Sequence, residues 1–242
     1  AEEVARAKSS LLMNMSHEIR TPLTAVIGYA ELLGDECGPE QTEQREYAAV
    51  IEHGGRRLLD TLNSVLDLAQ IEAGALPLVT VAVDLRDEAE AAITALQPLA
   101  QVKGLALTLA GAATAARVDR PALARVLTNL VGNAIKFTER GTVAVEVWAE
   151  AGAAWLRVSD TGVGIEASFL PRVFDDFAQE STGAARRFEG SGLGLAIAGG
   201  LVAKLGGEIS VTSEKGVGST FTVRLPAPAP DPGPGPSRLD AP

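Results

Sequence analysis

Two long helical patterns separated by a short turn occupy the first 73 residues of the chain. Residues 2–34 repeat apolar side chains at steps of three and four, with Pro22 inside the pattern, and residues 41–73 do the same. Because the connection is short, we expect an antiparallel helical hairpin. A lone hairpin cannot cover both apolar stripes, so the pattern predicts a dimeric four-helix bundle. The stripes are Leu12, Met15, Ile19, Leu23, Val26, Ala30 and Leu33, and Tyr47, Val50, Ile51, Leu58, Leu62, Val65 and Leu68.

The pattern changes after the hairpin. Helical periodicity alternates with short strand-like runs, which predicts an α+β sandwich with antiparallel strands and with helices on one face of the sheet. The expected helices are 85–102, 121–137 and 193–205, and the expected strands are 105–109, 142–148, 154–158, 208–212 and 219–225. From Pro226 onward seven of 17 residues are proline, which is typical of a disordered or extended segment. We therefore expect a hairpin domain at 1–73, a linker at 74–80, an α+β domain at 81–226 and a proline-rich disordered tail at 227–242.

Charge and cysteine content exclude several function classes. The chain has 242 residues and a net charge of −10, of which −7 belongs to residues 1–73. This balance disfavours nonspecific binding to nucleic acid or to an anionic membrane. Cys37 is the single cysteine, so an internal disulfide is excluded and a reducing compartment is indicated. The two histidines and one cysteine cannot by themselves build a structural zinc site.

The start of the chain and its hydropathy bear on location. The first residue is Ala1 rather than Met, which indicates a fragment. No apolar run reaches the length of a membrane span and no signal peptide is recognisable. We expect a cytoplasmic fragment, which is compatible with a membrane-anchored full-length protein.

A histidine on the first helix has an unusual set of neighbours. The string SHEIRTPL spans residues 16–23 and contains His17. This histidine lies about 200° around the helix from both Met15 and Ile19, so it faces away from the apolar stripe. Glu18 is adjacent and can accept an imidazole proton, and Thr21 at i+4 shares the same face. Most helical histidines are simply solvated, but a neutral imidazole beside a carboxylate is a competent nucleophile.

Three polar side chains share one face of the expected helix at 121–137. Asn129, Asn133 and Lys136 follow one another at steps of four and three within an otherwise apolar run. An amide oxygen suits Mg²⁺, which fills its octahedron with water and phosphate oxygens. A lysine supplies a point charge for phosphate. The helix therefore predicts a nucleotide or phosphate site.

Two glycine clusters follow in the sequence. The first, DTGVG at 160–164, directly follows an expected strand, and by itself it is equally typical of a tight turn. The second, GSGLG at 190–194, directly precedes a helix, where backbone N–H groups can approach phosphates. Neither matches a dinucleotide-binding or P-loop pattern. Their order behind the Asn/Lys helix is more specific than either cluster alone.

Residues 16–23 resemble the H-box, S-H-E-x-R-T-P-L, of HisKA-type sensor histidine kinases of two-component signalling. The later blocks are similar to the N, G1, F and G2 boxes of the GHKL-type (Bergerat) ATP-binding domain, in family order. The resemblance implies that His17 is phosphorylated from ATP and passes its phosphoryl group to an aspartate of a response regulator. It further implies that Glu18 assists proton removal and that Thr21 helps to place water for dephosphorylating the regulator. The homodimer is inferred from the apolar stripes of the hairpin.

For the second domain the resemblance implies specific contacts with ATP and Mg²⁺. Asp160 bonds the adenine amino group, Asn133 holds Mg²⁺, and Asn129 and Lys136 contact phosphate. The residues implied to shape the pocket and its lid are Gly162, Gly164, Arg187, Gly190, Gly192, Leu193 and Gly194. The F box is FDDF at 174–177, where many family members carry Glu-Pro in place of Asp-Asp.

Two other interpretations stay open on the sequence alone. One is a GHKL ATPase that hydrolyses ATP to drive a conformational change, and the other is a dimerising scaffold with a degenerate pocket. The stimulus, the cognate regulator, cis or trans phosphorylation, and a receiver domain beyond the tail are equally open.

Overall fold

The computed structural model describes residues 2–38, 40–180 and 192–228, and it describes the side chains of the first helix from Glu18 onward. The chain divides into two compact units. One comprises Ala1–Pro77 with Pro171–Gly200, and the other Leu78–Leu170 with Leu201–Pro242. Most of the proline-rich tail, from residue 229, lies outside the described residues.

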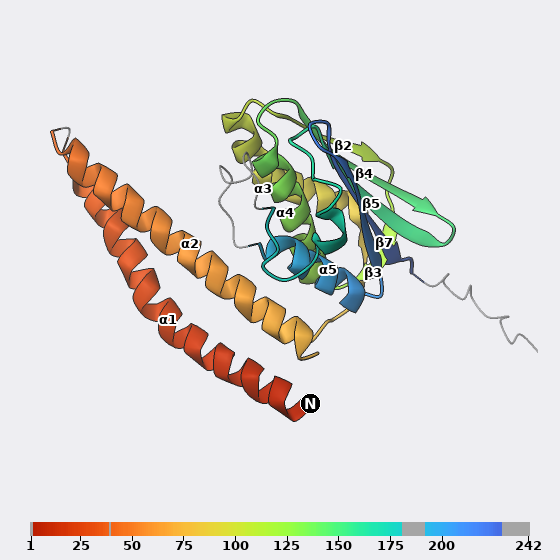
Figure 1. Ribbon diagram of the computed structural model, residues 1–242, viewed down its shortest axis with the longest axis horizontal. Helices are drawn as coiled ribbons and strands as arrows, with labels where there is room; N and C mark the ends of the chain where they lie inside the picture. Colours follow the sequence, from red (N-terminus) through yellow and green to blue (C-terminus); the bar gives the residue numbers. More distant parts are fainter. Residues whose placement is uncertain (1, 39, 181–191, 229–242) are drawn as a thin grey trace, which may run out of the picture. The chain divides into compact units, whose positions relative to one another are not determined.

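The N-terminal unit contains the expected helical hairpin. Helices α1 (Glu2–Glu36) and α2 (Thr42–Glu72) lie side by side in antiparallel directions (Figure 1). Helix α1 runs two residues further than the predicted end at residue 34. The helices approach closely at Gly55, because a Cβ there would lie 2.6 Å from Cγ1 of Ile27. A glycine in this helix interior therefore has a packing reason.

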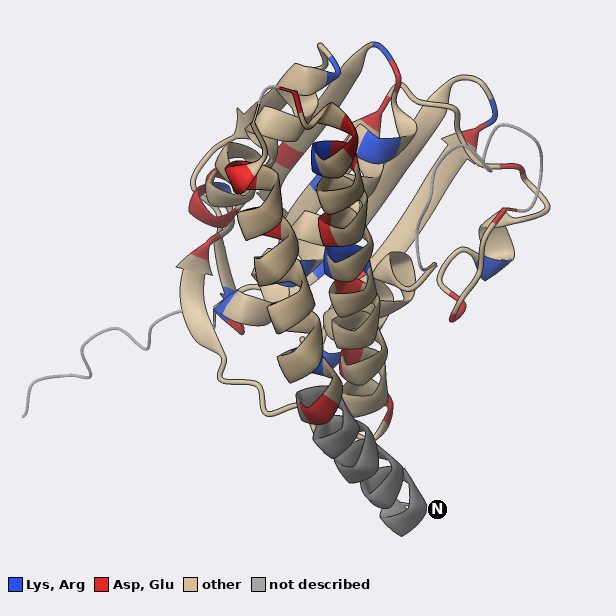
Figure 2. Cartoon of the chain, turned by 90° about the vertical axis from the view of Figure 1, so that its left-hand side faces the viewer, with Lys and Arg blue, Asp and Glu red and all other residues tan. Residues whose placement is uncertain are grey.

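Burial along the hairpin differs from the single stripe predicted for each helix. Ile27 and Ala30 on α1 and Ala48 on α2 are buried, whereas other apolar side chains on each helix are exposed to solvent. Much of the apolar set predicted for α2 is thus exposed in one copy of the chain. The exposed apolar residues of the hairpin are Ile19, Val26, Tyr29, Leu32, Leu33, Tyr47, Val50, Ile51 and Leu58. Acidic positions recur along the same two helices (Figure 2).

The second unit is built on a five-stranded sheet in the order β2-β4-β5-β7-β6. Helices α3 (Leu85–Val102) and α4 (Arg120–Phe137) pack on it (Figure 1). The α+β expectation is confirmed. The strands are β2 (Ala106–Gly111), β4 (Thr142–Glu150), β5 (Ala153–Asp160), β6 (Glu208–Glu214) and β7 (Gly218–Pro226). A short 3-10 turn (Leu170–Arg172) and helix α5 (Gly194–Lys204) each contain residues of both units.

The strand directions correct one expectation. We predicted antiparallel strands, but β2 and β4 pair in parallel, so the sheet is mixed. The chain between them passes through α4, and such a crossover is the connection that parallel neighbours require. The structure also contains a second, two-stranded antiparallel sheet, β1 (Val81–Asp84) with β3 (Ala115–Val118), which the sequence analysis missed.

Aspartate caps fix where α3 and α4 begin. Asp84 accepts hydrogen bonds from the backbone N–H groups of Arg86 and Thr114, both at 2.9 Å. Asp119 accepts from the backbone N–H groups of Ala122 at 2.9 Å and Val79 at 2.8 Å. Each carboxylate satisfies one donor in the first turn of its helix and one donor from a distant segment. The caps therefore anchor α4, which carries the predicted Asn/Lys face.

Among the residues that the structure describes, no helix is both long enough and apolar enough to cross a membrane.

Candidate functional site

The polar face of α4 is present as predicted. Asn129, Asn133 and Lys136 are all half-buried and follow one another along the helix. The Nδ2 atom of Asn129 is buried, and no hydrogen-bond partner for it exists in the described part of the chain. A buried amide without a partner is costly, so this atom marks a position where a ligand would restore a hydrogen bond. The Nζ atom of Lys136 lies 4.8 Å from the centre of the Phe137 ring.

Asp160 is the last residue of β5, and its backbone and side chain both have partners. Its Oδ1 atom accepts a hydrogen bond of 2.8 Å from the N–H of Gly162. Burial raises the pKa of the Asp160 carboxyl, and hydrogen bonds from the backbone of Gly162 and Ser219 oppose part of that rise. A carboxylate in this setting is available to accept a hydrogen bond from a ligand.

The loop after Asp160 is hydrogen-bonded to helix α4 and to strand β6. Towards α4, the N–H of Val163 donates to the carbonyl of Phe137 at 3.2 Å. Towards β6, the N–H of Ile165 donates to Oγ of Ser213 at 2.8 Å. Gly164 has a φ of +63°, and a Cβ on it would overlap the carbonyl oxygen of Glu214. The predicted Asp160 loop and the predicted α4 face therefore meet through Phe137.

The turn between β6 and β7 also contacts this site. The sequence predicts a hairpin around Gly216 and Gly218, but not its place beside the Asp160 loop. The N–H of Gly216 donates to the carbonyl of Val163 at 2.8 Å. Gly218 has a φ of +140°, and a Cβ on it would overlap the carbonyl oxygen of Asp160. The Gly-x-Gly spacing at 216–218 repeats that at 162–164, which is the sequence signal that connects this turn with the site.

The second glycine cluster is only partly described. Gly192 has a φ of +72°, Leu193 is fully buried, and α5 begins at Gly194. A Cβ on Gly192 would lie 3.0 Å from the carbonyl oxygen of Ala178, so glycine is favoured there by both backbone and space. Arg187 and Gly190, which the resemblance placed in the pocket and lid, lie outside the described residues.

The predicted phosphoacceptor string lies within α1. The structure places His17 in the helix, while its side chain is outside the described part. Glu18 and Thr21 are both exposed. Arg20 donates from Nη2 to Oδ1 of Asn63 at 3.0 Å, so the string is tied to α2 by a side-chain hydrogen bond.

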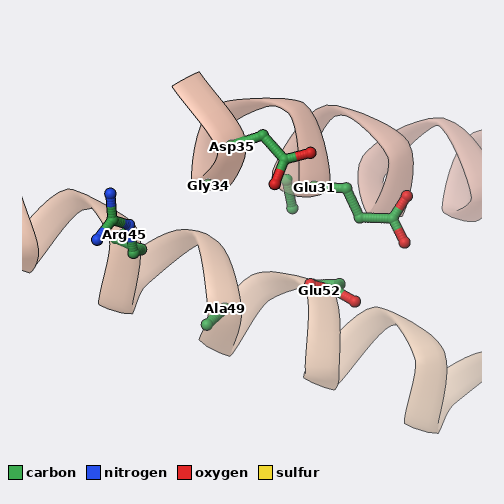
Figure 3. Close-up of a pocket in the computed structure, with 7 residues that line it drawn as sticks. Glu31, Gly34, Asp35, Arg45, Ala49 and Glu52 are labelled. Carbon is green, nitrogen blue, oxygen red and sulfur yellow. The ribbon is translucent and has the colours of Figure 1, made fainter. Parts of the chain in front are cut away.

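A hollow at the tip of the hairpin is a different kind of surface. Small residues of α1 and α2 leave a gap there, and carboxylates surround it (Figure 3). Its lining residues are Ala30, Glu31, Gly34, Asp35, Arg45, Ala49 and Glu52. Three carboxylates against one arginine disfavour a phosphate, so this hollow is not a candidate nucleotide site. Within the described ranges, no group of three or more His, Cys, Asp or Glu side chains is arranged to hold a metal ion.

Comparison with known families matches both parts of the chain. Residues 7–74 match the His Kinase A (phospho-acceptor) domain, and residues 118–229 match the histidine kinase-, DNA gyrase B-, and HSP90-like ATPase. The two matched segments contain the predicted phosphoacceptor string and most of the predicted nucleotide site.

Individual relatives agree with these families. The circadian input-output histidine kinase CikA of Synechococcus elongatus is 42% identical over 93% of this chain and 31% of its own length. The signal transduction histidine-protein kinase BarA of Escherichia coli is 40% identical over 91% of this chain and 25% of its own length. The chain thus spans less than half the length of the curated relatives that it matches.

A solved structure supports the same assignment. Full-length ShkA in complex with AMPPNP has a TM-score of 0.77 and 34% identity, covering 90% of this chain and 46% of that chain. This chain therefore belongs to the sensor histidine kinases of two-component signalling, with a HisKA phosphoacceptor domain followed by an ATP-binding HATPase domain.

Proposed function

We propose that this chain is the core of an ATP-dependent kinase that phosphorylates its own His17 and transfers the phosphoryl group to an aspartate of a response regulator. The single observation that carries the proposal is the unpartnered, buried amide of Asn129 on the face it shares with Asn133 and Lys136. Residues 1–73 act as the dimerisation and phosphotransfer domain, 74–80 as the linker and 81–226 as the catalytic domain. Its substrate ATP assigns this part of the protein to the cytoplasm.

The chain's own residues divide the work of binding ATP. Asp160 accepts the adenine amino group, and Asn129 and Lys136 contact phosphate oxygens. Gly162, Gly164, Gly192, Leu193 and Gly194 allow the backbone to approach the nucleotide, with Arg187 and Gly190 completing the lid. The amide oxygen of Asn133 fits Mg²⁺, because Mg²⁺ takes few protein ligands and prefers oxygen. When bound, Mg²⁺ neutralises developing charge on the phosphates.

The SHEIRTPL string on α1 performs the acceptor chemistry. Glu18 accepts the imidazole proton of His17 while the nitrogen bonds to the γ-phosphorus of ATP, the bond from that phosphorus to the β–γ bridging oxygen breaks, and ADP leaves. Thr21 positions water when the same domain acts as a phosphatase on the regulator. Because both side chains are exposed, a partner domain can reach them.

Incubation with ATP labelled at the γ-phosphate tests the proposal. We expect an acid-labile, base-stable label on the protein in the presence of Mg²⁺. Release of free phosphate without a protein label would support the alternative of a GHKL ATPase. Absence of Mg²⁺-dependent ATP binding would support the scaffold instead.

Dimerisation through the hairpin is the second part of the proposal, and exposed apolar side chains support it. Val50 is 70% exposed and Leu58 is 55% exposed on α2. Substituting Val50→Glu places a charge in the proposed interface, so we expect the dimer dissociation constant to rise at least about tenfold. Sedimentation of the full chain measures this.

Val102→Glu is the matched control for dimerisation, because Val102 is 89% exposed but lies on α3. It should leave the dissociation constant unchanged. A Val50→Glu chain that dimerises as tightly as the Val102→Glu chain would contradict an interface on this face of the hairpin.

The affinity for ATP should depend on pH through the titration of the Asp160 carboxyl. Its raised pKa means that the Asp160 carboxyl keeps its proton to a higher pH in the nucleotide-free folded protein than in the unfolded chain. The protonated carboxyl therefore stabilises the fold at low pH, and this contribution is lost as the pH rises through the folded-state pKa. Binding the adenine amino group needs the carboxylate, so affinity falls as the pH decreases through the same value, at a higher pH than an ordinary aspartate would give.

Substituting Asp160→Asn separates this carboxylate from other titrating groups. We expect ATP affinity at pH 7 to fall about tenfold to 100-fold, because a hydrogen bond to a charged acceptor is lost. Titration calorimetry between pH 5 and pH 8 should also show a flatter acid limb in the variant. An identical acid limb in both proteins would assign the pH dependence to another group.

A further inference from the structure

Lys103 makes three side-chain contacts that the proposed function does not use. It follows the last residue of α3, and its Nζ atom donates to the carbonyls of Ile135 at 2.7 Å, Lys136 at 2.7 Å and Thr138 at 3.2 Å. An ammonium group has three N–H donors, and here each has an acceptor. Lys103 is exposed, but partial desolvation of its ammonium group lowers its pKa, and the charge of Glu139 opposes this.

These contacts complete the hydrogen bonding of the last turn of α4. The carbonyl of Ala134 accepts from the N–H of Thr138 at 3.1 Å and from its Oγ1 at 2.7 Å. The carbonyl of Phe137 accepts from Val163. All five carbonyls from 134 to 138 therefore have partners within the protein, at a helix end where carbonyls usually depend on water or a cap. The positive charge of Lys103 also suits the negative end of the α4 dipole.

The same turn connects two parts of the nucleotide site. Asn133 and Lys136 lie on it or directly before it, and the loop after Asp160 is joined to it through Phe137. Gly162 lies against this turn as well, since a Cβ there would be 2.5 Å from the Phe137 carbonyl oxygen. Lys103 binds the carbonyls on either side of Phe137, so it fixes the turn from which that contact is made.

We propose that Lys103 is a positioning residue of the nucleotide site, which holds the end of α4 in register with the loop after Asp160. This role rests on the proposed function, because it has meaning only if Asn133, Lys136 and Asp160 bind ATP. Lys103 itself acts through the backbone and touches no phosphate. Loss of its three hydrogen bonds would let the α4 turn and the Asp160 loop move independently, which weakens contacts that ATP makes with both.

The test compares Lys103→Met with the same change at Lys204, which is exposed at the end of α5. Methionine keeps most of the side-chain length but removes the charge and all three donors. We expect the KM for ATP in His17 labelling to rise about tenfold or more, with a much smaller change in kcat, because misplacement of binding groups weakens ground-state contacts. Lys204→Met should match the wild type.

Local amide exchange distinguishes positioning from a general loss of stability. In Lys103→Met, residues 136–140 and 162–165 should exchange faster, while the strands of the sheet stay protected. Lys103→Arg keeps the charge and the donors, so its KM should lie closer to the wild-type value than that of Lys103→Met. If Lys103→Met does not fold, the KM and amide exchange of Lys103→Arg are compared with those of the wild type instead.

Three outcomes would overturn the role of Lys103. These are an unchanged KM in folded Lys103→Met, a KM equal to that of Lys204→Met, and uniform loss of amide protection across the sheet. Each leaves the proposed function intact as long as the wild-type chain binds ATP and labels His17. A wild-type chain that does neither would overturn the proposed function and this role together.

Discussion

Substituting His17→Gln should abolish the acid-labile phosphoryl label while leaving ATP affinity unchanged. Glutamine has comparable length and polarity, but its amide nitrogen is not nucleophilic and cannot form the bond to phosphorus. The proposed ATP contacts of Asn129, Asn133 and Asp160 are far from His17 in the sequence and belong to the other compact unit. Labelling should therefore fall to background, measured with γ-labelled ATP, and calorimetry should return the wild-type dissociation constant.

The second histidine of the chain supplies the matched control. The sequence contains two histidines, and His53 is exposed on α2 outside the H-box string. His53→Gln should keep the wild-type labelling rate and the same acid lability. Label that persists in His17→Gln, or disappears in His53→Gln, would assign the acceptor to another residue.

Local sequence signals predicted the helices of the second unit well. The helix predicted at 85–102 matches α3, and the one predicted at 121–137 differs from α4 by one residue. Both begin at an aspartate cap, and Pro121 marks the first turn of α4. Capping depends on neighbours within three residues, which is why a single sequence carries the information.

Pairings between distant segments could not be predicted in the same way. The β1–β3 sheet depends on partners more than 30 residues apart, and Asp84 is joined to Thr114 as well as to its own helix. Strand β2 pairs in parallel with β4 only because the intervening chain crosses through α4. Short strands of this kind have no periodicity that distinguishes one partner from another.

The site shows the same division between side-chain chemistry and backbone contacts. Asn129, Asn133 and Lys136 were predicted because amide and ammonium side chains stand out in an apolar helix. Lys103 was not predicted, because its acceptors are backbone carbonyls, which every residue possesses. The ligand roles of Asn129, Asn133 and Lys136 stay predictions, and Asp160→Asn tests the role of the carboxylate in the same site.

Substituting Gly164→Ala should strongly lower the stability of the second unit. At a φ of +63° an alanine costs about 1–2 kcal/mol by conformation alone. Its Cβ would also overlap the carbonyl oxygen of Glu214, which is backbone of strand β6 and cannot rotate away. Overpacking of this kind adds about 1–3 kcal/mol, so we expect the free energy of unfolding to fall by about 2–5 kcal/mol.

Gly152→Ala separates the two contributions. Gly152 has a similar φ of +72° in the turn between β4 and β5, but a Cβ there would meet nothing within 4 Å. It should therefore lose only the conformational part, about 1–2 kcal/mol. Urea unfolding can be followed by tryptophan emission, because the two tryptophans of the chain, Trp148 and Trp155, stack on each other in β4 and β5.

The same two variants test whether the close backbone contact at Gly164 also affects the affinity for ATP. An alanine at Gly164 must displace either its own loop or the β6–β7 turn, and both contact the backbone next to Asp160. We therefore expect ATP affinity to fall with stability in Gly164→Ala and to stay at the wild-type value in Gly152→Ala. Equal losses of stability in the two variants would show that conformation, rather than the close approach to Glu214, explains the glycine. A stable Gly164→Ala chain with normal ATP affinity would instead remove this loop from the nucleotide site.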